Sequence, residues 1–183
     1  MPPLLAKYDG RILQESYSIV TTIVTDGKVL VGDCQLTSGG VSLNYQDKIR
    51  KINGHLVGGC GSPDDLALFM AWYANPGKPP KLGKNFEAVV VNEAGSIFYY
   101  SNRLIPQQIH EPFYATGSGS YIALGALEHG ATPLEALKIA CKRDIHTGVG
   151  IAEIKLDEQR RKLPKKSGVR AGGGVRKKPG RKS

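Results

Sequence analysis

Residues 18–33, SIVTTIVTDGKVLVGD, place two runs rich in β-branched residues on either side of an Asp-Gly dipeptide. Valine, isoleucine and threonine favour strands, and Asp26-Gly27 favours a tight turn because glycine readily adopts a positive φ. This stretch therefore predicts a β-hairpin with strands at residues 18–25 and 28–33. We expect residues 1–15 to form a pro-segment or N-terminal extension ahead of it.

Further strands and helices follow the hairpin in the order strands, helix, strands, two helices and strand. Turn dipeptides separate the strands, and prolines directly after capping residues mark helix starts. Because the helices are segregated from the hairpins, an α+β fold is favoured over a doubly wound sheet. We expect strands at residues 48–52, 55–59, 86–92, 96–101 and 151–156, and helices at 62–73, 120–128 and 132–146, the last stopped by Gly148.

The charge is divided unevenly along the 183 residues. Residues 1–158 carry 14 Lys and Arg and all 16 Asp and Glu, a net charge of −2, whereas residues 159–183 carry 11 Lys and Arg and no acid. A segment this poor in apolar residues cannot bury enough surface to offset its chain entropy. We therefore expect a folded domain over residues 16–158 and a disordered basic tail over 159–183. The tail either contacts nucleic acid or another polyanion, or keeps the protein soluble.

The same composition argues against membrane and secretory classes. No apolar run approaches the ~20 residues that cross a bilayer, and residues 1–14 lack the apolar core of a secretory signal. Cys34, Cys60 and Cys141 are an odd number, with neither a CxxC pair nor metal-like spacing. Free thiols of this kind favour a reducing compartment, so we expect a cytoplasmic protein.

Polar residues recur beside glycine-rich turns at the ends of the expected strands and helices. They lie in GDCQLT at 32–37 (Asp33), KIRKI at 48–52 (Lys48), GGCGSPDD at 58–65 (Gly61), TGSGS at 116–120 (Ser118) and RDIHTG at 143–148 (Asp144). Each segment alone is a weak signal, because such turns are common. In this order and at these spacings, however, the five together resemble the proteasome β-subunit family, and within it the HslV peptidase branch. The resemblance covers residues 16–156.

This resemblance implies a four-layer αββα sandwich of the N-terminal-nucleophile hydrolase type, and hydrolysis of peptide bonds without a metal or organic cofactor. The family's nucleophile is an N-terminal threonine or serine, whose free α-amine can act as its base. The resemblance also implies a homo-oligomeric ring that takes peptides or unfolded proteins, with an ATP-driven unfoldase as a candidate partner.

Roles for individual residues follow from the resemblance. Asp33 resembles the carboxylate that orients the family's lysine, and Lys48 resembles that lysine, whose charge lowers the pKa of the nucleophile. Gly61 resembles the glycine whose backbone N–H binds the oxyanion, where a missing side chain lets the substrate backbone approach. The supporting polar cluster beside the N-terminal amine is matched by Ser118, Asp144 and Thr147.

The expected position of the nucleophile depends on the residue from which it is counted. The family spacing back from Asp33 leads to Tyr17, whose phenol cannot replace a hydroxyl that has an adjacent amine. Spacing from Lys48 favours Ser16, which opens a Ser-Tyr-Ser sequence resembling the Thr-Tyr-Cys start of the Anbu branch. Spacing from the Asp-Gly turn favours Ser18. We therefore expect Ser16 or Ser18 to be exposed by self-processing.

Two threonines further along the chain form a weaker alternative. Thr21 and Thr22 open a Thr-Thr-Ile-Val sequence like the family's own start. They lie so close to the hairpin turn that we expect too little strand to reach Asp33. The residue before the family's cleavage point is usually small, whereas Glu15 or Tyr17 would precede it here. This departure favours an inactive homologue as the main alternative.

Other readings of the same residues stay open. Taken alone, Asp33 and Lys48 fit a surface ion pair, Gly61 a tight turn and Ser118 a helix cap. The alternative function is a catalytically inactive ring or scaffold protein whose basic tail binds nucleic acid. A third reading is an N-terminal-nucleophile amidase that acts on small molecules.

Overall fold

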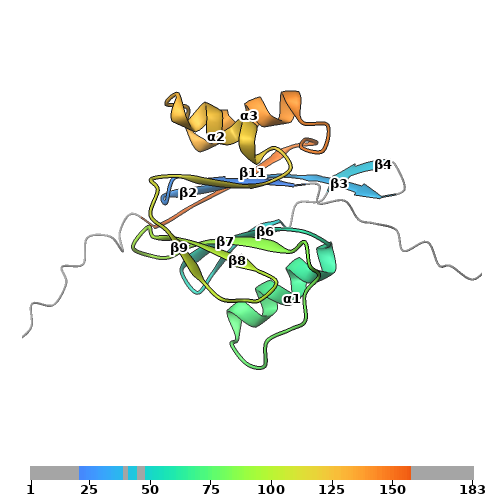
Figure 1. The fold of residues 1–183 in the computed structure, drawn as a ribbon, viewed down its shortest axis with the longest axis vertical. Helices are drawn as coiled ribbons and strands as arrows, with labels where there is room; N and C mark the ends of the chain where they lie inside the picture. The colour runs from blue at the N-terminus through green and yellow to red at the C-terminus, as the bar shows by residue number, and fades with distance from the viewer. Residues whose placement is uncertain (1–20, 39–40, 45–47, 158–183) are drawn as a thin grey trace, which may run out of the picture.

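The structure is a computed structural model that describes residues 21–38, 41–44 and 48–157. Figure 1 shows four layers: helices α2 and α3, a first sheet that contains β2 and β11, a second sheet that contains β6 to β9, and helix α1. The four-layer αββα architecture expected above is confirmed. The expected extension at residues 1–15 and the expected basic tail at 159–183 lie outside the described residues.

The first sheet is built around the hairpin predicted from residues 18–33. Its strand order is β10-β1-β2-β11, and every neighbouring pair is antiparallel. The Asp26 carboxylate accepts the backbone N–H groups of Lys28 and Val29, at 2.8 and 2.9 Å, and so closes the turn. The strands are β1 (Thr22–Thr25), β2 (Val29–Asp33), β10 (Tyr114–Gly117) and β11 (Ile151–Lys155).

The second sheet is a continuous antiparallel meander in the order β5-β6-β7-β8-β9. Its strands are β5 (Ile49–Ile52), β6 (His55–Cys60), β7 (Glu87–Val91), β8 (Ile97–Ser101) and β9 (Gln107–Ile109). A separate hairpin of β3 (Gln35–Ser38) and β4 (Val41–Asn44) follows β2. The predictions for β5 to β8 and β11 are confirmed to within two residues, whereas β3, β4, β9 and β10 were not predicted.

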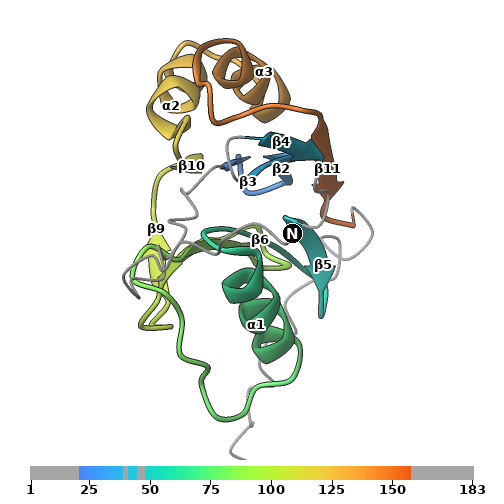
Figure 2. The same cartoon turned by 90° about the vertical axis from the view of Figure 1, so that its right-hand side faces the viewer.

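The helices begin where their capping residues predict. Ser62 caps α1 (Pro63–Ala74), and a capping box of Thr132 and Glu135 starts α3 (Pro133–Arg143), while α2 spans Ser120–Glu128. Figure 2 shows α1 beneath the second sheet, opposite α2 and α3. Within the described part of the chain, no helix is both long and apolar enough to cross a membrane.

The predicted end of α3 is wrong. The helix stops at Arg143 and not near His146, because Asp144 adopts an extended conformation as its C-cap. The carboxylate of Asp144 then accepts the backbone N–H of His146 at 3.1 Å, which holds the chain in a turn. Gly148 is not the left-handed stop, since the positive φ values of this segment belong to Val149 and Gly150.

Alternation along β1 decides which way its side chains face. Ile23 packs between the two sheets against Leu30 and Ile49, whereas Val24 packs beneath the helices against Leu137. Because strand side chains alternate between faces, Thr22 faces the helices and Thr21 faces the space between the sheets. This geometry positions the site described next.

Candidate active site

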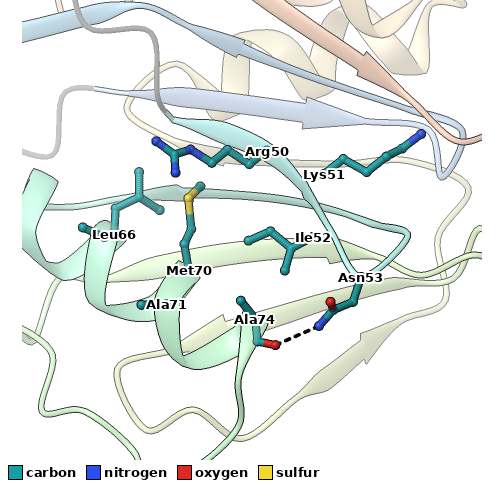
Figure 3. A pocket seen from close by; sticks show the side chains of 9 residues that line it. Arg50, Lys51, Ile52, Asn53, Leu66, Met70, Ala71 and Ala74 are labelled. Carbon is teal, nitrogen blue, oxygen red and sulfur yellow. Dashed lines mark hydrogen bonds between the residues drawn. The ribbon is translucent and has the colours of Figure 1, made fainter.

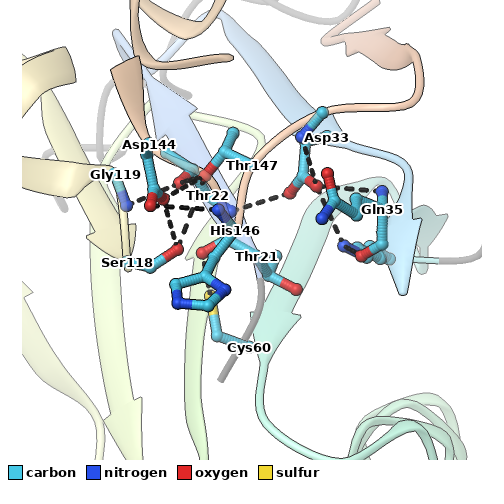
Figure 4. Close-up of polar contacts among 12 residues, drawn as sticks. Thr21, Thr22, Asp33, Gln35, Cys60, Ser118, Gly119, Asp144, His146 and Thr147 are labelled. Atoms are coloured by element: carbon cyan, nitrogen blue, oxygen red, sulfur yellow. Dashed lines mark hydrogen bonds and ion pairs between the residues drawn. The ribbon is translucent and has the colours of Figure 1, made fainter. Parts of the chain in front are cut away.

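The start of β1 lies between two groups of polar side chains that come from distant parts of the sequence (Figure 4). We call Asp33, Gln35 and Lys48 the lysine cluster, and Ser118, Asp144 and Thr147 the hydroxyl cluster. The structure therefore brings together five of the residues singled out from the sequence, in two groups. Thr21 and Thr22 link the groups.

The lysine cluster is a buried ion pair. Lys48 Nζ lies 3.2 Å from Asp33 Oδ2 and also donates to the backbone carbonyl of Gln35. The two charged side chains are 5% and 0% exposed, so the reading of this pair as a surface ion pair is wrong. Asp33 accepts three backbone N–H groups as well, those of Thr22 (2.8 Å), Gln35 (2.9 Å) and Gly148 (3.3 Å).

Burial dominates the electrostatics of this pair. It lowers the pKa of Lys48, and the charge of Asp33 offsets only part of that shift. It raises the pKa of Asp33, against the opposing effects of Lys48 and the backbone N–H groups. A charge held out of water interacts strongly with any charge that develops beside it. The Lys48 ammonium can therefore stabilise a neighbouring alkoxide, and its lowered pKa eases proton exchange.

The hydroxyl cluster surrounds one carboxylate. Ser118 Oγ and Thr147 Oγ1 each donate to Asp144 Oδ2 at 2.6 Å, and the Oγ1 atoms of Thr147 and Thr22 are 2.6 Å apart. Partial burial alone would raise the pKa of Asp144, but the bonds from Ser118, Thr147 and the His146 backbone together hold that pKa below its usual value. The hydroxyl of Thr147 therefore links the ionised Asp144 carboxylate to Thr22 of β1.

Thr21 is fixed by the contacts of its own backbone and of the next residue. Its carbonyl accepts the backbone N–H of Ser118 at 3.0 Å and lies 4.0 Å from Cys60 Sγ. Strand β10 comes so close that a Cβ on Gly117, which has φ +96°, would stand 1.8 Å from this carbonyl oxygen. Thr21 therefore lies between the two clusters (Figure 4), with its side chain on the face opposite that of Thr22.

The reason for setting Thr21 and Thr22 aside in the sequence is wrong. The pairing of Ile23 with Gly32 brings Thr22 opposite Asp33, and the Thr22 N–H reaches Asp33 Oδ1 at 2.8 Å. Four residues of β1 are thus enough to reach the lysine cluster. Ser16 and Ser18, the expected nucleophiles, lie outside the described residues, and their positions stay predictions.

Gly61 lies at the junction between β6 and α1, as the sequence predicts. Its φ of +124° is a conformation that L side chains rarely adopt, so the position favours glycine. The preceding residue, Cys60, is the one whose sulfur approaches the Thr21 carbonyl. Gly61 is therefore one residue away from a direct contact with Thr21, which places its backbone near the site.

Two hollows of the second sheet and its neighbours differ in charge, and the second of them adjoins the hydroxyl cluster. One, of about 510 Å³, lies between β5 and α1 and is lined by Leu66, Met70 and two cations, Arg50 and Lys51 (Figure 3). The other, of about 460 Å³, is lined by Ser118 and by further residues of β7, β10 and α2 that include a carboxylate. Across the described residues, no group of three or more His, Cys, Asp or Glu side chains is placed to hold a metal ion.

Comparisons with known proteins locate the similarity in the fold. No family model matches the sequence, and no curated protein matches it. Among solved structures, Thiobacillus denitrificans BPH is 20% identical with a TM-score of 0.59, covering 75% of this chain and 98% of that one. BPH in complex with epoxomicin is 19% identical with a TM-score of 0.58, and the match covers the same shares of the two chains. HslV from Trypanosoma brucei is 19% identical with a TM-score of 0.54, and the match covers 73% of this chain and 97% of that one.

Proposed function

Because this chain has the fold of the proteasome β-subunit and HslV group, we propose that it is a peptidase subunit. We propose Thr21 as its nucleophile, exposed as a new N-terminus by removal of residues 1–20. The observation that carries this proposal is the Thr22–Asp33 hydrogen bond, which places Thr21 between the lysine and hydroxyl clusters. Thr21 is 4% exposed in the full chain, so processing must precede access by substrate.

Each cluster supplies one part of the proposed reaction. The free α-amine of Thr21 takes the proton from Oγ1, which bonds to the carbonyl carbon of the substrate. The Lys48 ammonium, held by Asp33, stabilises the alkoxide, and the Gly61 N–H stabilises the oxyanion of the tetrahedral intermediate. The C–N bond then breaks, and the leaving amine departs with the proton from the α-amine. Water hydrolyses the remaining ester and regenerates Thr21.

Processing acts on the chain's own peptide bond, before the α-amine of Thr21 is free to act as a base. Oγ1 of Thr21 attacks the carbonyl carbon of residue 20, the C–N bond breaks, and the proton from Oγ1 ends on the nitrogen, so that the α-amine becomes free and the acyl group is left on oxygen as an ester. Water then hydrolyses this ester, which releases residues 1–20 and restores the Thr21 hydroxyl. The hydroxyl cluster supports this amine, because Asp144 keeps a negative charge near the place where an ammonium forms.

Assembly and partners are further parts of the proposal, supported by the fold alone. A homo-oligomeric ring, a cytoplasmic location and an ATP-driven unfoldase as feeder follow from the resemblance to HslV. The expected absence of a metal or organic cofactor belongs to the same proposal. The size of the assembly is checked by light scattering of the full chain, where a monomer would count against the ring.

The activity is tested on a pool of fluorogenic peptides, with small amides as the comparison. The purified chain hydrolyses peptides, and Thr21→Ala abolishes this, whereas Ser16→Ala and Ser18→Ala retain it. Epoxomicin, which is bound in one of the similar structures, is a second probe. Hydrolysis of small amides alone would identify an amidase. Salt-sensitive DNA binding that is lost on deleting residues 159–183, without hydrolysis, would favour the scaffold.

A further inference from the structure

A carboxylate stands in the hollow beside Ser118. Glu87 is the first residue of β7, and its register partner on β6 is Cys60. The hollow of about 460 Å³ is lined by Glu87 together with Tyr114, Thr116 and Tyr121. Among the described residues that line it there is no lysine, arginine or histidine, and Glu87 supplies the formal charge.

In the part of the chain that the structure describes, the neighbours of this carboxylate are hydroxyl groups. Thr116 Oγ1 donates to Glu87 Oε2, and the Tyr99 hydroxyl is a second hydrogen-bond partner. Burial, and then the charge of Glu87, raises the pKa of Tyr114 to about 12, and the same two causes raise the pKa of Tyr99. None of the ion pairs within the described part of the chain includes Glu87. No lysine or arginine among residues 21–38, 41–44 and 48–157 therefore forms an ion pair with the carboxylate in this hollow.

The hollow lies on the side of Thr21 from which the amine product leaves. Ser118 lines it and also donates its backbone N–H to the Thr21 carbonyl. In the proposed reaction the α-amine of Thr21, beside the hydroxyl cluster, returns a proton to the leaving nitrogen. The leaving amine must therefore be on the hydroxyl-cluster side, and the residue that follows the cleaved bond enters next to this hollow.

From this placement we propose that the hollow binds a cationic side chain, lysine or arginine, on the residue that follows the cleaved bond. This inference rests on the proposed peptidase function and adds its substrate class. The Glu87 carboxylate pairs with the ammonium or guanidinium group, and Tyr114 and Tyr121 present ring surfaces that suit a cation. Tyr121 is 87% exposed and can close over a bound side chain.

The test compares two fluorogenic peptides that differ only in the residue after the cleaved bond. One carries arginine and the other carries citrulline, which has nearly the same shape without the charge. We expect kcat/KM to be about tenfold higher for the arginine peptide at low salt, which corresponds to about 1.4 kcal/mol, because a partly exposed ion pair and a cation–π contact act together. The ratio should shrink in 1 M NaCl.

Glu87→Gln should lower this ratio to about threefold or less, because the amide keeps the shape and removes the charge, while the cation–π contact with the tyrosine rings remains. Glu128→Gln, on the exposed end of α2, is the matched control and should keep the ratio. A wild-type ratio near one, or an unchanged ratio in Glu87→Gln, would overturn the inference. If neither peptide is hydrolysed, the proposed function fails separately. In that case the affinities of the two intact peptides, measured by fluorescence anisotropy, test the hollow by themselves. Tighter binding of the arginine peptide supports the inference, and equal affinities contradict it.

Discussion

The two clusters that hold the start of β1 differ in the way they treat charge. The lysine cluster buries a full ion pair and surrounds Asp33 with backbone N–H groups. The hydroxyl cluster keeps one carboxylate partly exposed and reaches β1 through neutral hydroxyls. In the first, the low-dielectric surroundings strengthen electrostatic stabilisation. In the second, proton exchange with solvent stays easy. In the proposed reaction, this difference fits alkoxide stabilisation on one side of Thr21 and support of the amine on the other.

The largest expected effect follows from removing the buried cation. Lys48→Met leaves the Asp33 carboxylate buried without its partner, which costs about 3–5 kcal/mol of unfolding free energy. Peptide hydrolysis should fall by about 10³-fold or more, because a preorganised charge is lost. Urea unfolding and initial rates measure the two effects.

Two further variants sharpen this result. Lys51→Met removes a cation whose partner, Asp157, is 60% exposed, and should cost less than about 1 kcal/mol. The double variant Asp33→Asn with Lys48→Met should recover part of the lost stability without recovering activity. An equal loss of stability in the Lys51 and Lys48 variants would contradict the buried lysine cluster.

An intermediate effect is expected where β1 meets the hydroxyl cluster. Thr22→Val keeps the shape of the side chain but removes the oxygen that accepts the Gly119 N–H at 2.9 Å and contacts Thr147. Leaving a buried N–H unpaired costs about 1–3 kcal/mol. Thr22→Ser restores the hydroxyl and should recover most of this stability in thermal unfolding. If Thr22→Val and Thr22→Ser destabilise the folded protein equally, the hydroxyl contacts of Thr22 do not hold β1 in place.

The smallest expected effect is a dependence on pH. The folded pKa of Asp144 lies below its ordinary value, so the ionised group stabilises the folded state at pH values above its unfolded pKa of about 3.9. This contribution is lost as the pH falls through the folded pKa. Relative to wild type, Asp144→Asn should therefore be destabilised at pH 6, and the difference should shrink below about pH 4. A difference that stays constant down to pH 2 would refute this.

Local signals predicted most of the fold correctly. The hairpin around Asp26-Gly27, the capping residues of α1 and α3, and the strands of the central meander follow from propensity and turn chemistry. Strands β3, β4, β9 and β10 were missed because they are short and, unlike the equally short β1 and β5, do not flank an Asp-Gly or Asn-Gly turn. The early end of α3 was missed because it depends on contacts of the Asp144 side chain with later residues.

The site was predicted less completely than the fold. Asp33, Lys48, Ser118, Asp144 and Thr147 were singled out together, and the structure groups them around β1. The position of the strand between them could not be obtained from spacing, because a one-residue shift of register reverses every side chain. The pairing of Ile23 with Gly32 and the hydrogen bond from Thr22 to Asp33 locate Thr21. The Thr-Thr-Ile-Val sequence was the signal that could have found it.

The most direct test is the intact mass of the freshly purified chain together with the identity of its N-terminal residue. Wild-type protein should lose residues 1–20 and begin at Thr21, and Thr21→Ala should keep its full length. Thr21→Ser should still process, because a hydroxyl remains next to the new amine. A mature chain that begins at Ser16 or Ser18, or a full-length chain that hydrolyses peptides, would contradict the assignment of Thr21.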